Sequence, residues 1–331
     1  MRLLIVTVVS ALVFVPLVPG AVAKPAVPSL YLGIAGDAAR FKGQTGQESA
    51  IHHVFISWDQ GRTFGKRIPV LLRSLAPIPM VHVGTGGPLG TTEAINPAQI
   101  ANGQGDAFLV ALNQGIAEYG QLVYIRLLAE MNHFRRFHAG YRQNGTSKGP
   151  AYSPETYRKA FARMYLLLHG GPSTAINAAL RRLGLPGFTG GDLASNPPSK
   201  LRVIWNPLGG GQPAVPGNAA ARYYPGDRYV EIVGNDLYGE QGQFARPQNE
   251  ALYAFARAHG KPFAFPEYGL IDDDYPAFVR YVCEFIRGHS GIELAAYYKS
   301  EAGSRYDLGD KPKSRQAYRE CITPLGRKPG P

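Results

Sequence analysis

Two glutamates stand where apolar runs end, and together they have the chemistry to hydrolyse a glycosidic bond. Glu130 closes the segment Val123-Tyr-Ile-Arg-Leu-Leu-Ala-Glu130, and Glu267 has the same place in Lys261-Pro-Phe-Ala-Phe-Pro-Glu267. A buried strand reaches solvent at such a point, so both carboxyl groups are expected at strand ends. A retaining glycosidase needs two carboxyl groups close in space, one as acid/base and one as nucleophile. The fold must therefore bring these glutamates together.

Acidic, aromatic and amide residues occur near the ends of the other apolar runs. Such side chains suit a sugar, because its C–H face stacks on aromatic rings and its hydroxyl groups need hydrogen-bond partners. Arg126 is expected to point inward and to be paired, supporting the site. The candidates for the substrate-binding site are Trp58, Arg126, Asn132, Trp205, Asn206, Asp236, Tyr238 and Tyr298.

Eight short apolar runs, with helical patterns between many of them, must position these residues. The runs cover residues 30–34, 54–58, 78–83, 123–129, 201–205, 230–237, 263–266 and 292–298, and helical patterns cover 106–118, 157–169, 175–183, 248–258 and 277–287. Continuous apolar strands that alternate with helices indicate a parallel sheet covered on both faces. In a chain of this length they predict an α/β fold, one (β/α)₈ TIM barrel over residues 24–331. A doubly wound open sheet is the alternative.

In such a barrel the active site lies at the carboxyl ends of the strands. Side chains alternate along a strand between the barrel interior and the helix layer. Leu128 and Glu130 are therefore expected to share one face, and Glu267 is expected to share one with Phe263 and Phe265. This alternation would direct both glutamates toward the same rim.

Three segments resemble motifs of glycoside hydrolase family 26, whose best-known members are endo-β-mannanases. Arg126-Leu-Leu-Ala-Glu130-Met-Asn132 resembles the acid/base motif of the family. The segment from Tyr224-Pro-Gly-Asp227 to Asp236-Leu-Tyr238 is similar to its sixth-strand signature, and Lys261-Pro-Phe-Ala-Phe-Pro-Glu267-Tyr-Gly269 resembles its nucleophile strand. The motifs come in the family's order and span about half of residues 24–331.

The resemblance implies a (β/α)₈ barrel and retaining hydrolysis of a β-linked polysaccharide, mannan-like or another β-glycan. By position, Glu130 would be the acid/base, held protonated by its neighbour's charge and partial burial, and Glu267 would be the nucleophile. Tyr238 would donate a hydrogen bond to the nucleophile, Asp236 would line the sugar site, and Trp205 would help form the cleft floor. This mechanism needs no cofactor.

The chain departs from the family around the acid/base. Ala129 stands where the family usually has histidine, and His133-Phe-Arg-Arg-Phe137 follows Asn132 where glycine and tryptophans are usual. The eighth apolar run ends in Tyr297-Tyr298 in place of tryptophan. These differences leave a second class open, a non-catalytic carbohydrate- or cell-envelope-binding barrel descended from such an enzyme. A serine esterase is disfavoured, because the chain has no G-x-S-x-G elbow.

The first residues predict export. Met1-Arg2 precedes an apolar stretch over residues 3–18 and then Ala21-Val-Ala23, which together are typical of a signal peptide over residues 1–23. The apolar stretch is too short to favour a membrane span, and an uncleaved anchor is the alternative. No later stretch is long and apolar enough to cross a bilayer. We expect a monomer that is secreted or held at the cell envelope.

The formal charge of +11 falls to +10 when the signal peptide, with its one basic residue, is removed. A basic exported chain can attract nucleic acid or an anionic surface polymer. The basic residues are scattered and form no block with interleaved aromatic residues, which disfavours nucleic acid. We therefore expect a polysaccharide substrate and loose association with an anionic cell envelope.

The chain has two cysteines, Cys283 and Cys321. In an oxidising compartment such a pair predicts a disulfide, here one that ties the last helix to the body. His133 and His138 are the alternative metal ligands, but no carboxylate or cysteine lies near them at ligand spacing. The sequence therefore predicts a disulfide and no metal site.

Overall fold

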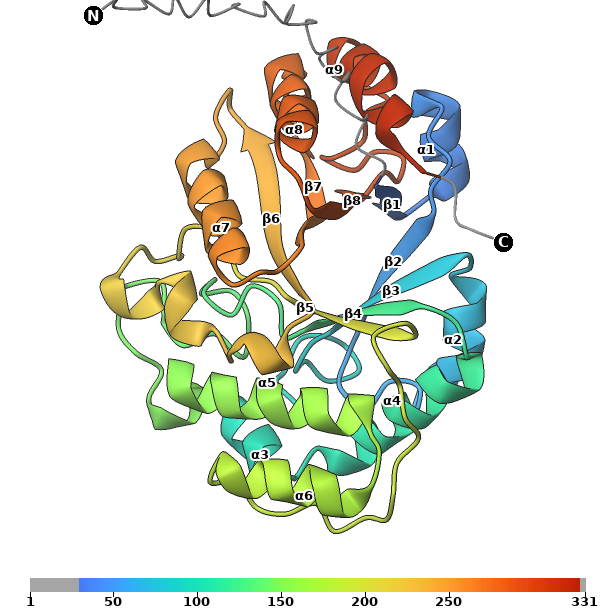
Figure 1. Ribbon diagram of the computed structural model, residues 1–331. Coiled ribbons are helices and arrows are strands. Elements are labelled where there is room, and N and C mark those ends of the chain that lie inside the picture. Colours follow the sequence, from blue (N-terminus) through green and yellow to red (C-terminus); the bar gives the residue numbers. More distant parts are fainter. Residues whose placement is uncertain (1–29, 328–331) are drawn as a thin grey trace, which may run out of the picture.

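A computed structural model describes residues 30–327, so the expected signal peptide, residues 1–23, lies outside the described residues. Eight parallel strands close into a barrel in sequence order (Figure 1). This confirms the predicted (β/α)₈ barrel and excludes the doubly wound open sheet. The strands are β1 (Tyr31–Ala35), β2 (Ile51–Ile56), β3 (Ile78–Val83), β4 (Val123–Leu127), β5 (Leu201–Trp205), β6 (Ile232–Glu240), β7 (Phe263–Ile271) and β8 (Ile292–Tyr298).

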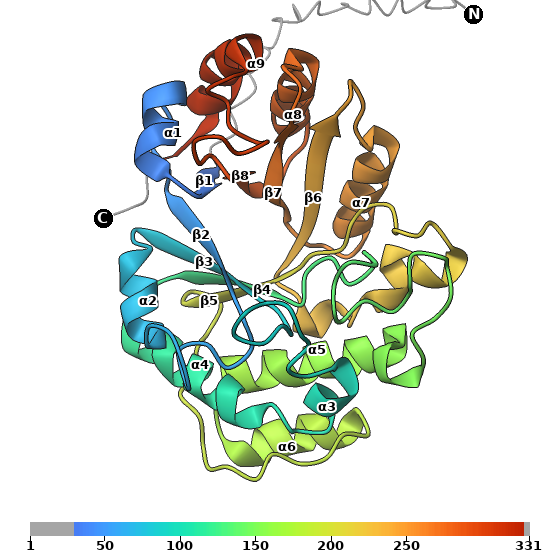
Figure 2. The ribbon, with the colours of Figure 1, turned by 180° about the vertical axis from the view of Figure 1, so that it is seen from behind.

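Helices surround the strands on the outside of the barrel (Figures 1 and 2). They are α1 (Ala38–Thr45), α2 (Ile68–Ser74), α3 (Pro97–Ala101), α4 (Asp106–Tyr119), α5 (Pro154–His169), α6 (Ser173–Arg182), α7 (Arg246–Ala258), α8 (Pro276–Gly288) and α9 (Pro312–Ala317). Sequence analysis missed α1, α2 and α3, which are at most eight residues long and carry too few turns for a helical pattern. The expected last helix, which holds Cys321, is present: α9 continues directly into the helical segment Tyr318–Ile322. Between residues 30 and 327, no helix has both the length and the apolar character that a membrane crossing requires.

Apolar side chains cover both faces of the sheet. Inside the barrel, a cluster that includes Ile51, Met80, Tyr124, Ile204 and Leu294 fills the interior. A larger cluster occupies the space between the strands and the helices. Because both faces are buried, the strands read as continuous apolar runs in the sequence, which is why their positions were predictable.

The predicted alternation fails in β7, next to Glu267. The register of β7 with both neighbouring strands shifts within the segment that follows Phe265. Phe263 and Phe265 pack in the helix layer, whereas Glu267 points to the barrel interior, where it meets Arg126. A β-bulge re-aims the side chains beyond it, and Pro266, which cannot donate to the sheet, lies at this point. The expectation that Glu267 shares a face with the two phenylalanines is therefore wrong.

The alternation also fails at the end of β4. The strand stops at Leu127, and Leu128 and Glu130 have left-handed backbones with φ of 46° and 55°. Leu128 packs in the helix layer, so it does not share a face with Glu130 as expected. The Glu130 N–H donates to the carbonyl of Asn206 at 2.7 Å, which anchors the turn on the loop after β5. Left-handed residues other than glycine are uncommon, and such strained positions cluster at functional sites.

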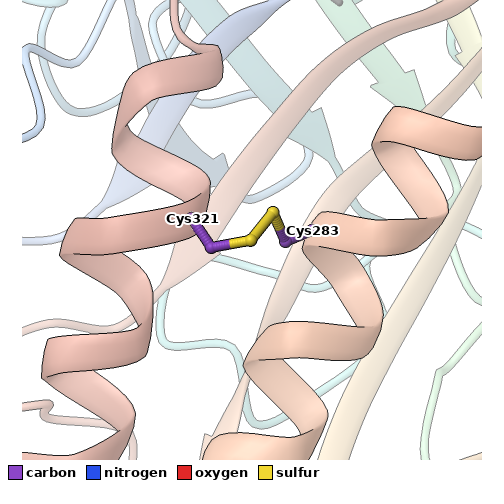
Figure 3. Close-up of a disulfide and its surroundings, with 2 residues drawn as sticks. All are labelled: Cys283 and Cys321. Atoms are coloured by element: carbon purple, nitrogen blue, oxygen red, sulfur yellow. A yellow bond between two sulfur atoms is a disulfide. The ribbon is translucent and has the colours of Figure 1, made fainter.

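The predicted disulfide is present and joins α8 to the C-terminal helical segment (Figure 3). The Cα atoms of Cys283 and Cys321 are 5.9 Å apart, and the Cys283 side chain is fully buried in the helix layer. The bond closes a loop of 38 residues, so it restricts the unfolded chain more than the folded one.

Removing this bond with the double substitution Cys283→Ala/Cys321→Ala is expected to lower the free energy of unfolding by about 3–4 kcal/mol. Urea denaturation of the variant and of the oxidised wild type measures the difference. Activity at 25 °C should be retained, because the bond lies in the helix layer and not at the barrel end. Equal stabilities of the two proteins would contradict the prediction.

Candidate active site

Polar side chains from neighbouring strands gather at the carboxyl end of the barrel. The register pairs His82 of β3 with Arg126 of β4, and Asp236 of β6 with Glu267 of β7. All four are buried, which is unusual for charged groups unless they are paired. The cluster consists of His53, His82, Arg126, Glu130, Asn206, Asp236, Tyr238, Glu267 and Tyr298.

Arg126 lies at the centre of this cluster and is fully buried. Its Nη2 lies 2.5 Å from Oδ2 of Asp236, its Nη1 donates to Oε1 of Glu267, and its Nε lies 2.9 Å from Oδ1 of Asn206. Nη1 also lies 3.2 Å from Nε2 of His53. Burial disfavours the charge, but the two carboxylates outweigh it and raise the pKa of Arg126. A guanidinium with these contacts and no exposure positions other groups and does not contact a ligand.

Glu267 has a partner on each carboxyl oxygen. Oε1 accepts from Arg126, and Oε2 accepts from the Tyr238 hydroxyl at 2.8 Å. Burial and the neighbouring charge of Glu267 raise the pKa of Tyr238 well above its usual value, so the phenol keeps its proton and donates it. Glu267 is thereby a carboxylate held in one orientation, which is what a nucleophile at a sugar carbon requires.

Glu130 forms an ion pair with Arg136, a residue that sequence analysis did not select. Nε of Arg136 lies 2.6 Å from Oε2 of Glu130, and Nη2 donates to the same oxygen. Burial favours the neutral acid, but the charge and hydrogen bonds of Arg136 outweigh it and lower the pKa of Glu130. The lowered pKa is opposite to the expectation that Glu130 is held protonated. The basic pair Arg135-Arg136 close after Glu130 was the available signal.

Asp236 connects the two glutamates. Burial raises its pKa well above the usual value; the charge of Arg126 opposes this and the charges of Glu267 and Glu130 add to it. Oδ1 of Asp236 receives no hydrogen bond from any donor within residues 30–327. Burial and the two glutamate charges therefore favour the neutral form of Asp236, whereas the charge of Arg136 favours the ionised form of Glu130.

Aromatic rings surround this cluster at the end of β8. The Tyr298 ring centroid lies 5.8 Å from that of Tyr238, 4.8 Å from that of Tyr306 and 5.9 Å from that of Phe55. Tyr298 is half-buried and Phe55 is 42% exposed, so both can be reached from solvent. Tyr306 and Phe55 were missed in the sequence, because neither ends an apolar run. These rings can stack on the C–H face of a sugar.

The two asparagine candidates have supporting positions. The Asn132 side chain exchanges two hydrogen bonds of 2.9 Å with the backbone of Leu208, which ties the loop after β4 to the loop after β5. Asn206 accepts from Arg126. Both are fully buried. They hold the turn that carries Glu130 in place and are not exposed to a ligand.

Neither tryptophan joins the cluster. Trp205 is fully buried in the helix layer, its ring centroid 4.9 Å from that of Tyr224 and 5.7 Å from that of Phe255. Alternation along β5 turns it away from the barrel interior, so it does not form the expected cleft floor. Trp58 packs on Phe108 at 4.9 Å and lines a different pocket of about 370 Å³, which none of the clustered residues line.

The histidine alternative for a metal site has no support in the geometry. Nε2 of His138 lies 3.0 Å from the carbonyl of Ala129, and its Nδ1 lies 3.4 Å from the Thr85 hydroxyl. Burial lowers the pKa of His138 to about 4, so the ring is neutral. No group of three or more His, Cys, Asp or Glu within the described part of the chain, residues 30–327, has the geometry to hold a metal ion.

Solved structures with a similar fold include β-mannanases. The catalytic domain of the GH26 endo-β-1,4-mannanase of Bacillus sp. JAMB-750 has a TM-score of 0.58 and 14% identity, over 91% of this chain and 87% of that one. The GH26 β-mannanase of Bacteroides ovatus has a TM-score of 0.55 and 13% identity, over 91% and 90%. A β-mannanase from a protist symbiont of the termite Reticulitermes speratus, complexed with a gluco-manno-oligosaccharide, has a TM-score of 0.55 and 15% identity, over 91% and 88%.

No protein-family model matches the sequence, and no curated protein matches it. The structural likeness nevertheless covers nearly the whole chain. At these identities the likeness establishes the fold, and the chemistry must be argued from the site itself.

Proposed function

We propose that the chain is a retaining glycoside hydrolase of β-linked polysaccharides. It shares the fold of family 26 β-mannanases, and two glutamates lie at the carboxyl ends of its barrel strands. The observation that carries the proposal is the unequal setting of the two carboxyl groups. Glu267 is fixed between Arg126 and Tyr238. Glu130 is paired instead with the partly exposed Arg136, and its neighbouring carboxyl group, Asp236, has a raised pKa. Such a pair suits a nucleophile and an acid/base.

In the first step, Glu267 attacks the anomeric carbon and forms a glycosyl ester. Glu130 gives its proton to the leaving glycosidic oxygen as the C–O bond breaks. In the second step, Glu130 takes a proton from water, the water oxygen attacks the anomeric carbon, and Glu267 leaves as a carboxylate. Arg126 and Tyr238 keep the Glu267 carboxylate in line for both steps, and Asp236, whose raised pKa favours its neutral form, is the group from which Glu130 takes the proton that the first step requires.

A reducing-sugar screen of the purified protein against β-mannan, β-glucan, xylan and cell-wall polymers tests this function. Proton NMR of the early products then tests the stereochemistry, and we expect the β-anomer to form first because two displacements retain configuration. An α-anomer as the first product would contradict the retaining mechanism while leaving hydrolysis intact. The absence of hydrolysis with every polymer would contradict the hydrolase.

A second function, a non-catalytic carbohydrate-binding barrel, is favoured by one observation. Arg136 forms an ion pair with Glu130, the proposed acid/base. A permanent pair would prevent Glu130 from giving a proton to the glycosidic oxygen. Such a protein would bind glycans without turnover. Isothermal titration with β-linked oligosaccharides, followed by product analysis of the same sample, separates this function from the hydrolase.

We also propose that the protein is exported and associates loosely with an anionic cell envelope. The signal-peptide pattern of residues 1–23 and the net charge of +11 support this proposal. Fractionation of cells that express the full chain, or the chain from residue 24, tests it. We expect only the full chain to leave the cytoplasm. High salt should release the envelope-bound fraction, because it screens the attraction between the basic protein and the anionic envelope.

A further inference from the structure

We propose that Arg136 is the receptor for a substrate carboxylate, so that the preferred polymer is an acidic β-glycan with a uronic acid unit beside the cleaved bond. The inference rests on the proposed hydrolase function and names its substrate class. It begins from the ion pair between Glu130 and Arg136, in which the arginine side chain extends toward solvent.

Arg126, at the centre of the cluster, and Arg136, which pairs with Glu130 of the cluster, differ in what can reach them. Arg126 is fully buried, whereas the side chain of Arg136 is 37% exposed. Nε and Nη2 of Arg136 converge on one oxygen of Glu130. A guanidinium presents its donors as a rigid fork that matches a carboxylate, and it can pass from one carboxylate to another without losing its charge partner. An entering ligand can therefore compete with Glu130 for Arg136.

A neutral sugar is a poor competitor for this arginine. Its hydroxyl groups cannot replace an ion pair with a carboxylate that is itself only 7% exposed, because hydrogen bonds between charged groups are roughly twice as strong as neutral ones. A uronate carboxylate replaces Glu130 charge for charge. The substrate would then hold Arg136, and Glu130 would be free to act on the glycosidic oxygen.

The same exchange would prepare Glu130 as an acid. The groups that face its carboxyl are Arg136, His133, Arg126 and Asp236. When Arg136 moves to the substrate, the largest influence that lowers the pKa of Glu130 is removed, and burial, which favours the neutral form, remains. The proton of Asp236 can then reside on Glu130. Recognition of the carboxylate and protonation of the acid are thus one event.

Two polymers that differ only at C6 test the proposal, β-1,4-mannan and β-1,4-mannuronan oligosaccharides of equal length. We expect kcat/KM of the wild type to be about 10- to 100-fold higher on the acidic oligosaccharide, the range of a charge-assisted contact. Arg136→Gln should lose this preference through a loss on the acidic substrate. Arg135→Gln is the matched control, because Arg135 is the adjacent, exposed arginine whose cation lies over the Phe134 ring.

The pH profile of Arg136→Gln on the neutral oligosaccharide gives a readout that a purely structural role would not change. Hydrolysis needs protonated Glu130, so activity falls as pH rises through the pKa of Glu130. Loss of Arg136 raises that pKa, and the alkaline limb of kcat/KM should move to higher pH. An unmoved limb would count against the exchange.

The outcomes separate this inference from the proposed function. Hydrolysis of mannan with no preference for mannuronan, or a preference that survives Arg136→Gln, overturns the inference and leaves the hydrolase standing. If neither oligosaccharide is hydrolysed, calorimetric titration of both into the wild type and Arg136→Gln decides. Tighter binding of mannuronan that depends on Arg136 supports the receptor although the hydrolase fails; equal binding, or none, overturns both.

Discussion

Glu267→Gln is expected to lower kcat for glycan hydrolysis on the order of 10⁴-fold or more, with a thermal midpoint close to that of the wild type. Glutamine keeps the shape; its amide oxygen can accept from Arg126 and its amide N–H can donate to the Tyr238 hydroxyl oxygen, but it has no negative charge with which to attack the anomeric carbon. Initial rates on the best polymer from the screen and a thermal melt measure both quantities.

Glu293→Gln is the matched control for this prediction. Glu293 lies near the amino end of β8 and pairs with Arg202 at 2.7 Å and with the Tyr124 hydroxyl at 2.7 Å. It is therefore a glutamate with an arginine and a tyrosine partner at the opposite end of the barrel. Its substitution should leave kcat within a few-fold, and equal losses in the two variants would refute the assignment of Glu267.

Chemical rescue distinguishes the roles of the two glutamates. Azide added to Glu267→Ala should occupy the vacated space, attack the anomeric carbon and give a glycosyl azide of inverted configuration, whereas azide added to Glu130→Ala should give the retained configuration. Glu130→Ala should also keep much of its activity on an aryl glycoside with a good leaving group, because that group departs without a proton. The opposite pattern of products would exchange the two roles.

Arg126→Met is expected to lower the free energy of unfolding by about 3–5 kcal/mol at pH 7 and to abolish activity. The substitution leaves the Glu267 carboxylate buried without its cation, and it removes from Asp236 the charge that opposes the rise of its pKa. Unpaired buried carboxylates take up protons more readily, so their folded-state pKa values rise above the unfolded ones. The destabilisation should therefore be fully present above the folded pKa values and shrink as pH falls through them. Urea denaturation at pH 7.5 and pH 5 measures this difference.

The controls separate site chemistry from packing. Arg163→Met removes another buried arginine, which holds Asp106 at 2.5 Å in the helix layer. It should destabilise the fold but keep kcat of the folded protein near that of the wild type. Adding Glu267→Gln to Arg126→Met should restore part of the lost stability, because one unpaired buried charge is then absent. An Arg126→Met variant as stable as the wild type would contradict the central role of this residue.

The barrel was predictable because its strands are buried on both faces and its longer helices carry several turns of pattern. β3, β5 and β8 begin and end at the residues that the apolar runs predicted. The helices α1, α2 and α3 were not predictable, since tertiary contacts stabilise segments whose own pattern spans about two turns or fewer. The alternation rule failed at Glu130 and at Glu267, because a left-handed turn and a β-bulge change the direction of side chains without a clear sequence signal.

The sequence predicted which residues form the candidate site better than it predicted their charge interactions. Asp236, Tyr238 and Glu267 lie where strand ends placed them, and the disulfide formed as expected. Trp205 was misplaced, because an aromatic residue at a strand end has two faces to choose between and the helix layer offered Tyr224 and Phe255. Arg136 was overlooked, because an arginine in a polar loop has no pattern that names its partner.

Glu130 and Glu267 show which properties of the site depend on the sequence alone and which depend on the tertiary structure. The sequence by itself determined that two glutamates follow buried strands of one parallel barrel, since burial, strand order and chain length depend on local composition. Only the tertiary structure decided what each carboxyl group can do. The protonation and orientation of a buried carboxyl group depend on charges within a few ångströms, and the groups that supply them come from three segments of the chain: Arg126 from β4, Arg136 from the loop after it, and Asp236 and Tyr238 from β6.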